Sequence, residues 1–349
     1  MAGSRAARER VERVCAAGAD ARTVRLRLLA EFRRAVRFDA YAWILTDPET
    51  QVGCAPLADV PCLPKLPELV RLRYVTALNR WTTLIEPPVA LLAEATNGDL
   101  GRSLLWRELL CRYGVVDVAT VVFRDGFGCW AFLELWRLGG DPFDRTDAEF
   151  LQDVTPAVTA ALRRCLARTF EPTAAPTHEG GPLMLLLSPD LRVLRRTPDT
   201  QQALRLLVPR DDEGPPVPAG AYNVAAQLLA VEAGVDLGPP SARVHLTGNC
   251  WLTLRAVRLE GEAPREERDV AVIIDESSPT ERLSLFARCT GLSARETELL
   301  GHLATGADTR EMAAGMFLSA YTVQDHLKSV FDKTDTRSRR TLLARALGG

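Results

Sequence analysis

The side chains best placed to bind another molecule lie between Ser319 and Arg339. Ser319 can cap the N-terminus of a helix that runs to about Lys333. One face of that helix is apolar at spacings of four and three residues, and would anchor it to a core through Val323, Leu327 and Val330. The opposite face is polar and carries Tyr321, Gln324, Asp325, Lys328, Ser329 and Asp332.

Three side chains on this polar face have the hydrogen-bonding groups that distinguish base pairs. The amide of Gln324 suits adenine N6 and N7, and the ammonium of Lys328 suits guanine O6 and N7. The carboxylate of Asp325 can accept a hydrogen bond from cytosine N4. The alternative interpretation is a solvated helix face that contacts nothing. The surrounding elements decide between the two.

Three more short helices are expected around this one. Ser293 and Glu296 have the spacing of a capping box, Asp308 can cap a second helix, and Ser338 can cap a fourth. Gly306 follows the first helix, where a left-handed residue is needed. The residues expected to face inward are Leu299, Leu300, Leu303, Met312, Ala313, Met316, Leu342, Leu343 and Ala346. Two helices joined by a tight turn, the second with exposed polar groups, are typical of a helix-turn-helix that enters the major groove.

A run of matching residues extends from Leu292 to Gly349. It comprises Leu292-Ser-Ala-Arg-Glu-Thr-Glu-Leu-Leu, Ala304-Thr-Gly306, Glu311-Met-Ala313, Leu318-Ser319, Thr322-Val323, His326-Leu327, Lys333 and Arg337-Ser-Arg339. In this register the segment resembles the LuxR-type (NarL/FixJ) DNA-binding domain. The resemblance implies base readers at Gln324, Asp325 and Lys328. It also implies phosphate contacts at Thr322, Lys333 and Arg339.

Three positions depart from the family pattern. Thr334 replaces a residue that is usually apolar, Asp335-Thr336 replaces a usual Gly-Val, and Gly315 lies within the second helix. None of them lies on the expected recognition face, so they bear on stability and sequence preference.

The charge of this segment supports DNA binding only modestly. From Leu292 onward there are eight basic and seven acidic residues, whereas the stretch from His326 to Arg345 has a local charge of +4. The whole chain has a formal charge of −2. A small positive area on each copy predicts a homodimer on double-stranded DNA, because phosphate contacts supply much of the affinity.

Composition indicates a water-soluble protein of two or three domains. The chain has 349 residues, 47% of them hydrophobic and 25% charged. No apolar run approaches the roughly 18–20 residues that span a membrane, and Met1 to Arg13 lack a secretory signal's apolar core. The eight cysteines form no Cys-x-x-Cys pair, so we expect reduced thiols, no metal and a cytoplasmic location.

Residues 20–170 are expected to form a sensory domain. An amphipathic helix from Arg22 to Val36 precedes a strand at 38–45, a hairpin of strands at 115–123 and 129–138, and a long helix from Asp147 to about Phe170. A strand, a hairpin and a long final helix in this order resemble the end of a GAF domain. The long helix contains Pro156, which should kink it, and an apolar stripe of Leu151, Val154, Val158, Leu162 and Leu166. The stripe either pairs with a second copy or packs on its own sheet.

Residues 183–276 are expected to form a second sensory domain, after a Pro/Gly-rich linker at 171–182. Strands are predicted at 183–187, 191–195, 243–246, 250–259 and 270–274, helices at 199–207 and 222–232, and a loop at 211–220. Two strands, helices and three strands resemble the order of a PAS domain. Asn249-Cys250-Trp251-Leu252 is similar to a flavin-binding cysteine motif, but a buried cysteine that begins a strand is favoured. Residues 276–291 lead into the DNA-binding segment.

No catalytic constellation is visible. Gly126-Phe-Gly128 lies between two strands and favours a turn over a phosphate cradle. Asp275 ends a strand like a phosphoacceptor, but no lysine lies between Lys65 and Lys328 to complete a receiver site. A single His245 does not make a haem site, and the tryptophans favour core packing over a ligand pocket.

The sequence therefore predicts an α+β multidomain chain. GAF-like and PAS-like α/β sensory domains at 20–170 and 183–276 precede an all-α four-helix LuxR-type helix-turn-helix domain at 285–349. The predicted function is a one-component transcriptional regulator with no enzymatic activity and no cofactor. A small-molecule ligand of the sensory domains is a further expected partner. The alternative is a signalling adaptor or an enzyme that acts through the N-terminal region.

Overall fold

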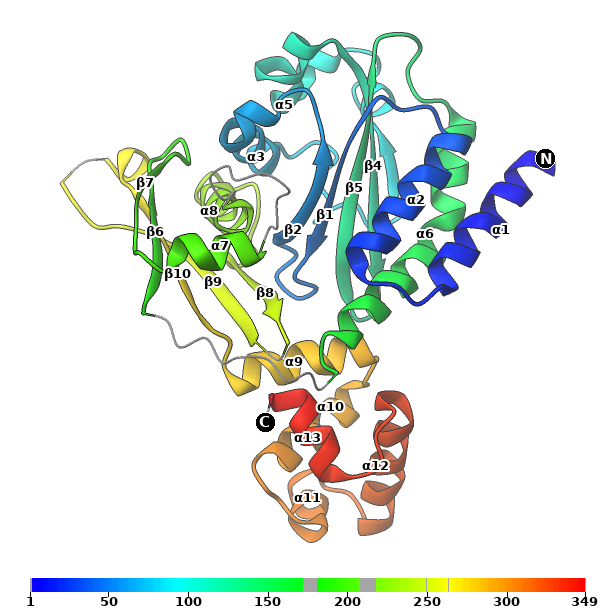
Figure 1. Ribbon diagram of the computed structural model, residues 1–349, viewed down its shortest axis with the longest axis vertical. Helices are drawn as coiled ribbons and strands as arrows, with labels where there is room; N and C mark the ends of the chain where they lie inside the picture. Colours follow the sequence, from blue (N-terminus) through cyan, green and yellow to red (C-terminus); the bar gives the residue numbers. More distant parts are fainter. Residues whose placement is uncertain (1, 172–180, 208–217, 249, 263, 349) are drawn as a thin grey trace. The chain divides into compact units, whose positions relative to one another are not determined.

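The computed structural model describes residues 2–171, 181–207, 218–248, 250–262 and 264–348 (Figure 1). They form two compact units. The first comprises the described parts of residues 1–162, 179–246 and 252–275. The second comprises the described parts of residues 163–178, 247–251 and 276–349.

The first unit contains a five-stranded antiparallel sheet with the order β2-β1-β5-β4-β3. Its strands are β1 (Ala40–Thr46), β2 (Gly53–Asp59), β3 (Val89–Leu91), β4 (Val115–Asp125) and β5 (Gly128–Leu138). The predicted hairpin is confirmed, since β4 and β5 are joined by Gly126-Phe127 and Asp125 Oδ1 accepts from Phe127 N at 2.9 Å. β2 and β3 were not predicted from sequence.

Three helices cover one face of this sheet, namely α1 (Ala2–Ala16), α2 (Ala21–Ala35) and α6 (Arg145–Arg168) (Figure 1). The aromatic ring of Phe32 on α2 stacks on Trp43 of β1 at 5.9 Å and meets Phe150 of α6 at 6.3 Å. Pro156 lies inside α6 without ending it.

The apolar stripe of α6 belongs to this core. Leu151, Val154, Val158 and Leu162 are at most 3% exposed, and Leu166 is half-buried. The hypothesis that this stripe pairs with a second copy is therefore wrong, because its side chains are already enclosed within the chain.

The other face of the sheet carries shorter elements. They are α3 (Leu66–Val75), α4 (Leu92–Ala95), α5 (Leu104–Glu108) and the 3-10 segments η1 (Leu63–Lys65), η2 (Leu100–Arg102) and η3 (Leu110–Tyr113). They bury a cluster that includes Leu69, Leu72, Leu109 and Trp136.

The first unit also contains a second five-stranded sheet, with the order β7-β6-β10-β9-β8. Its elements are β6 (Leu183–Leu187), β7 (Val193–Arg196), α7 (Thr200–Leu207), α8 (Ala219–Glu232), β8 (Ser241–Thr247), β9 (Cys250–Arg258), η4 (Arg265–Glu267) and β10 (Val270–Glu276). The predicted succession of two strands, helices and three strands is confirmed.

Some sequence predictions here are corrected or fall outside the described residues. The predicted loop at 211–220 is wrong at its end, because Ala219 and Gly220 begin α8; its residues 211–217 are outside the described part. Most of the linker at 171–182, and Asn249, also lie outside it. Cys250 is buried and begins β9, so the strand interpretation is confirmed, and the cysteine is not on the helix that the flavin motif requires.

Helix α8 joins the two sheets of the first unit, since it packs against α3 and β2 (Figure 1). Gly53 in β2 allows this approach, because a Cβ there would lie 3.0 Å from Asn223 Nδ2 and 2.7 Å from Ile44 Cγ2. Two ion pairs reinforce the junction, Arg243 to Asp47 and Arg80 to Asp236, each with a 2.7 Å contact. The two sheets therefore share one compact unit.

The second unit is built from helices, α9 (Pro279–Thr290), α10 (Ala294–Ala304), α11 (Thr309–Gly315), α12 (Ala320–Thr334) and α13 (Arg339–Leu347). The four predicted helices at 293–347 are confirmed, and the helix α9 was missed. The ring of Phe170 stacks on Trp251 at 5.2 Å and meets Phe286 of α9 at 5.4 Å. These three aromatic side chains pack together within the second unit.

Candidate nucleic-acid interface

The turn between α11 and α12 is set by local hydrogen bonds. Asp308 caps α11 by accepting from the backbone N–H groups of Arg310 and Glu311, at 2.7 and 2.9 Å. Ser319 caps α12, and its Oγ accepts from Thr322 N at 3.0 Å. These bonds satisfy donors that a helix N-terminus otherwise leaves open. The two helices are thus held as a helix-turn-helix.

One face of α12 is locked into the unit. Val323 and Val330 are fully buried, and Leu327 is 3% exposed, as their spacing predicted. Leu299, Leu300, Met312 and Leu342 complete this core. Because the buried face fixes the rotation of the helix, the side chains on the other face have defined directions.

The exposed face of α12 presents the three predicted base readers. Gln324, Asp325 and Lys328 are all exposed; the first two are adjacent, and Lys328 lies about one turn further along the helix. Among the described residues, none of the three side chains forms a hydrogen bond or an ion pair. Their donors and acceptors are therefore available to a partner.

The three predicted phosphate-contacting residues are more engaged. The hydroxyl of Thr322 lies 2.9 Å from Ser319 Oγ, and Arg339 Nη2 donates to Thr309 Oγ1 at 2.8 Å. Lys333 Nζ donates to both carboxylate oxygens of Glu296, at 2.7 and 2.9 Å. An ammonium has three N–H donors, so Lys333 keeps one for another partner.

Glu296 is the polar centre of the unit, and sequence reasoning recognised only its capping role. Its side chain is 5% exposed and accepts from Ser293 N at 2.6 Å and Ser329 Oγ at 2.6 Å, besides Lys333. Burial alone would raise the pKa of this carboxyl, but the hydrogen bonds from Lys333, Ser329 and Ser293 lower it to about 2. Glu296 is therefore ionised and joins α10 to α12.

The departures from the family pattern at 334–336 compensate one another. The buried hydroxyls of Thr334 and Thr336 lie 2.9 Å apart, and Thr334 Oγ1 also donates to Val330 O at 2.7 Å. Asp335 between them is left-handed with φ 48°, a conformation that Asp tolerates better than most residues. Gly315 has a packing role, because a Cβ there would lie 2.9 Å from the ring of His302.

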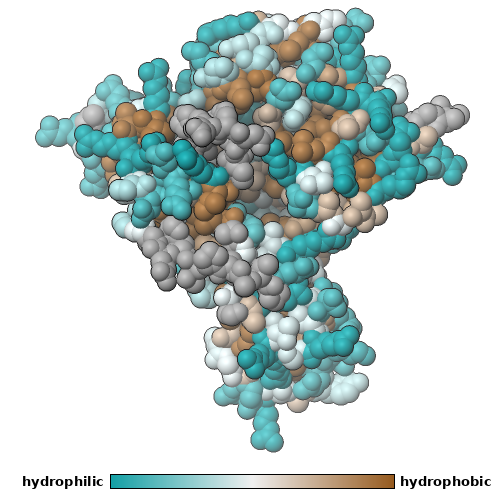
Figure 2. Space-filling model, viewed as in Figure 1, coloured by the Kyte–Doolittle hydropathy of each residue, from teal (hydrophilic) through white to brown (hydrophobic). Residues whose placement is uncertain are grey.

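Two aromatic side chains border the recognition face and are unusually exposed. Phe317, in the turn, is 94% exposed, and Tyr321, at the start of α12, is 77% exposed. The face of the C-terminal helices that Figure 2 shows is mostly hydrophilic or neutral. Tyr321 lies on the polar face of α12 that was expected from the sequence.

The missed helix α9 had sequence signals. Ser278 and Glu281 form a capping box, Pro279 occupies the first turn, and Gly291 ends the helix in the left-handed region with φ 72°. Leu285 and Phe286 of α9 are buried, whereas Leu283 is half-buried. α9 packs on α13, and Leu342 and Ala346 of α13 are buried within the unit.

In the described ranges, no group of three metal-ligating side chains is close enough to hold an ion. No helix that the structure describes is long and apolar enough to cross a membrane.

Capped helices with an interior apolar face, two of them joined by a fixed turn, define a helix-turn-helix domain. Residues 290–346 match the family described as bacterial regulatory proteins, luxR family. The C-terminal helices are therefore a LuxR-type helix-turn-helix DNA-binding domain.

Two further comparisons concern longer stretches. The chain is 34% identical over 125 residues to the probable HTH-type transcriptional regulator GfsR of Streptomyces halstedii. That alignment covers 36% of this chain and 48% of GfsR, so the chain spans about half the length of this relative. The Vibrio cholerae VqmA dimer, described among LuxR-type receptors, is 17% identical over 49% of this chain and 83% of that one. Its TM-score is 0.18, which carries no argument about the fold.

Proposed function

We propose that this chain is a one-component transcriptional regulator whose N-terminal region controls operator binding by the C-terminal domain. The observation that carries the proposal is the exposed set Gln324, Asp325 and Lys328 on a helix whose opposite face is fully buried. Base readers need this combination, because discrimination requires polar groups held in a fixed direction.

In this function Gln324, Asp325 and Lys328 contact base edges in the major groove. Thr322, Lys333 and Arg339 contact phosphates. The remaining donor of Lys333 and the other guanidinium donors of Arg339 suit a phosphate oxygen, which accepts from several N–H groups at once. The bonds to Glu296 and Thr309 orient these two cations and leave part of each side chain accessible.

We propose that two copies bind two half-sites. The local charge of +4 from His326 to Arg345 includes Lys333, which Glu296 partly neutralises. One copy then offers few phosphate contacts, and a dimer doubles them. A dimer with one recognition helix in each copy suits two half-sites about one turn of the DNA helix apart. Most of the α6 stripe, and Leu342 and Ala346 of α13, are buried within the chain, so we expect the dimer contact to use another surface.

We propose the domain division 20–170, 183–276 and 285–349, with a GAF-like and a PAS-like region before the DNA-binding domain. The strand–hairpin–helix ending of the first region and the element succession of the second support this assignment. The protein would act on chromosomal DNA in the cytoplasm, and the sensory regions would bind a small molecule.

A gel shift with genomic fragments, using the full chain and a chain ending before residue 285, tests the proposal. We expect specific retardation by the full chain only. Retardation by the truncated chain, or by neither, would favour the adaptor or enzyme alternative. Chromatin immunoprecipitation of the tagged protein would then identify the operators.

A further inference from the structure

The first unit contains an apolar cavity of about 60 Å³ between its first sheet and the helices α3 and α8. Ala42, Ile44, Pro56, Ala58 and Phe132 line it from the sheet. Val60, which directly follows β2, also lines it, as do Leu63, Leu66, Leu69 and Val70 of η1 and α3. The second region contributes Ala219 and Asn223, from the first two turns of α8. Both sheet-containing regions therefore build the cavity.

The side chain of Asn223 is the feature that points to a ligand. Asn223 is 5% exposed, lines the cavity, and has no hydrogen-bond partner among the described residues. A side-chain amide carries two donors and two acceptor positions, and those of Asn223 face the cavity. A polar group that enters the cavity would satisfy them.

The charged residues of the cavity wall already neutralise each other. Arg73 and Glu134 form an ion pair, and their side chains are 7% and 6% exposed. The guanidinium of Arg73 also lies 5.8 Å from the ring centre of Phe132, which lines the same cavity. Because the pair has no net charge, the wall offers no uncompensated charge to an ionic ligand.

We propose that this cavity binds a small, neutral, mainly apolar molecule through one carbonyl or hydroxyl group that hydrogen-bonds to Asn223. This site would give the proposed sensory function its ligand class, and in that respect it rests on the proposed function. A cavity of about 60 Å³ holds roughly four to six water molecules. The ligand is therefore compact, on the order of six to eight non-hydrogen atoms.

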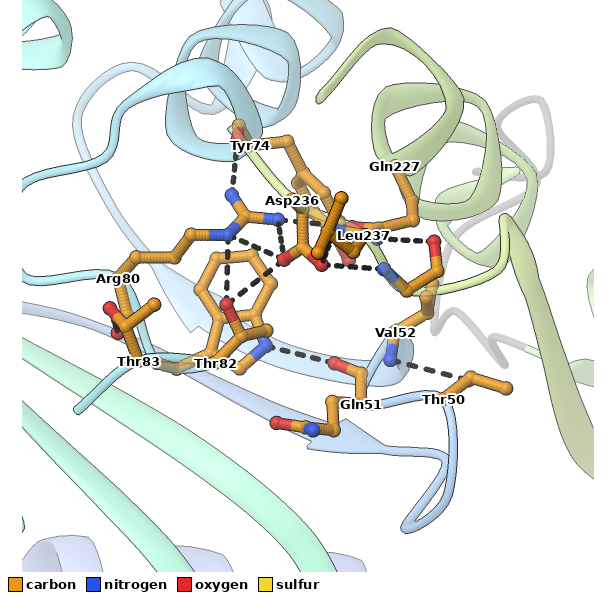
Figure 3. Close-up of polar contacts among 12 residues, drawn as sticks. Thr50, Gln51, Val52, Tyr74, Arg80, Thr82, Thr83, Gln227, Asp236 and Leu237 are labelled. Atoms are coloured by element: carbon orange, nitrogen blue, oxygen red, sulfur yellow. Dashed lines mark hydrogen bonds and ion pairs between the residues drawn. The ribbon is translucent and has the colours of Figure 1, made fainter. Parts of the chain in front are cut away.

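The position of Asn223 links the cavity to the junction between the two regions. Gln227 lies one turn further along α8, where its Oε1 accepts from Arg80 Nη2 at 3.0 Å and its Nε2 donates to Gly238 O at 2.9 Å (Figure 3). Tyr74 lines the cavity, and its backbone carbonyl accepts from Arg80 Nη1 in the same network (Figure 3). A molecule bound to Asn223 would thus contact the helix that holds the second region on the first.

The test uses the full chain and three probes that share a six-membered ring, namely cyclohexanone, methylcyclohexane of the same size, and the anion cyclohexanecarboxylate. Saturation-transfer NMR, in the absence of DNA, measures the binding of each. We expect saturable binding of cyclohexanone, on the order of millimolar. Asn223→Leu should lower the affinity for cyclohexanone about fivefold, which is the effect of losing one hydrogen bond. The affinity for methylcyclohexane should stay the same or rise.

Filling the cavity provides the second test. Ala58→Phe and Val70→Trp each place bulk into it from a different element, so one remains informative where the other disturbs folding. Both should abolish cyclohexanone binding. Glu298→Gln, at an exposed residue of α10 in the second unit, should bind cyclohexanone and DNA like the unaltered chain. A gel shift on the same samples reports DNA binding separately, so failure of the cavity and failure of the regulator proposal are distinguishable.

Three results would overturn the proposal. The first is no saturable binding of cyclohexanone to the unaltered chain. The second is equal binding to that chain, to Asn223→Leu and to the filled variants. The third is a preference for cyclohexanecarboxylate over cyclohexanone, because an anionic ligand contradicts the neutral wall formed by Arg73 and Glu134.

Discussion

Lys333 of α12 meets Glu296 of α10 through both carboxylate oxygens, at 2.7 and 2.9 Å. Glu296 is nearly enclosed, whereas the side chain of Lys333 is 40% exposed. The buried anion therefore determines where an exposed cation beside the recognition face is held. A residue identified as a phosphate contact is at the same time part of the internal support of the recognition helix.

The first prediction is that Glu296→Gln lowers the stability of α12 against local unfolding. The pKa of Glu296 is lowered from 4.5 to about 2 in the folded chain, so its contribution is fully present above about pH 4.5 and is lost as the pH falls towards 2. At pH 7 the variant should lose about 2 kcal/mol of the free energy that keeps α12 closed, which gives roughly thirtyfold faster amide hydrogen exchange in α12. At pH 3 the difference between variant and unaltered chain should be smaller.

Glu298→Gln is the matched control for this measurement. Glu298 pairs with Arg295 on the same helix, but both side chains are well exposed, at 40% and 59%. Exposed pairs contribute little, so exchange in α12 should hardly change. An equal effect of the two variants at pH 7 would contradict the central role of Glu296.

The second prediction separates base reading from phosphate contact. Lys328→Ala should weaken binding to a matched operator by about 1–3 kcal/mol and relax the preference at one base position. Arg339→Ala should weaken binding to matched and to scrambled DNA by the same factor, because a phosphate contact carries no sequence information. Titrating both variants on both DNAs by fluorescence anisotropy decides this. Equal losses on the two DNAs for Lys328→Ala would remove it from the base readers.

The third prediction concerns Phe317, which is 94% exposed and has φ 56°. A bulky residue in the left-handed region is strained, so Phe317→Gly should stabilise the helix-turn-helix by about 0.5–1 kcal/mol. An exposed, strained aromatic residue beside α12 suggests a contact with DNA, so the same variant should bind DNA more weakly. Thermal unfolding and a gel shift measure the two effects. A variant that is more stable and binds DNA normally would limit Phe317 to the turn.

The sequence predicted the second unit well because its information is local. Ser293, Asp308, Ser319 and Ser338 each cap the helix that follows them, and a cap acts within three residues. The face of α12 that is buried could also be predicted locally, because Val323, Leu327 and Val330 recur at helical spacing. Even α9 could have been found from Ser278 and Glu281.

The long-range contacts could not be predicted in this way. Glu296 and Lys333 are 37 residues apart, and Asp47 and Arg243 are 196 residues apart. Nothing in the local pattern at 47 or 243 indicates the pair, because it forms only when α8 and the second sheet pack on the first. The apolar stripe of α6 left core packing and pairing equally open for the same reason. The cavity at Asn223 depends on this packing too.

The fourth prediction is that Arg80→Met weakens the junction between the two sheets. Arg80 is 1% exposed and donates to Asp236 Oδ2 at 2.8 Å from Nε and to Gln227 Oε1 at 3.0 Å from Nη2 (Figure 3). Removing it leaves the carboxylate of Asp236 without its cation, which for buried pairs costs about 3–5 kcal/mol. Urea unfolding, followed by limited proteolysis near α8, should show a transition at lower urea in the variant.

The double variant Arg80→Met with Asp236→Leu tests the physical reason. Replacing both members with apolar side chains removes the uncompensated charge, so the double variant should regain part of the stability that Arg80→Met loses. Arg107→Met is the control, because Arg107 pairs with Glu108 at the surface with both side chains about half exposed. It should unfold like the unaltered chain. If Arg80→Met also unfolds normally, or if the double variant is less stable than the single one, the ion pair does not hold the two sheets together.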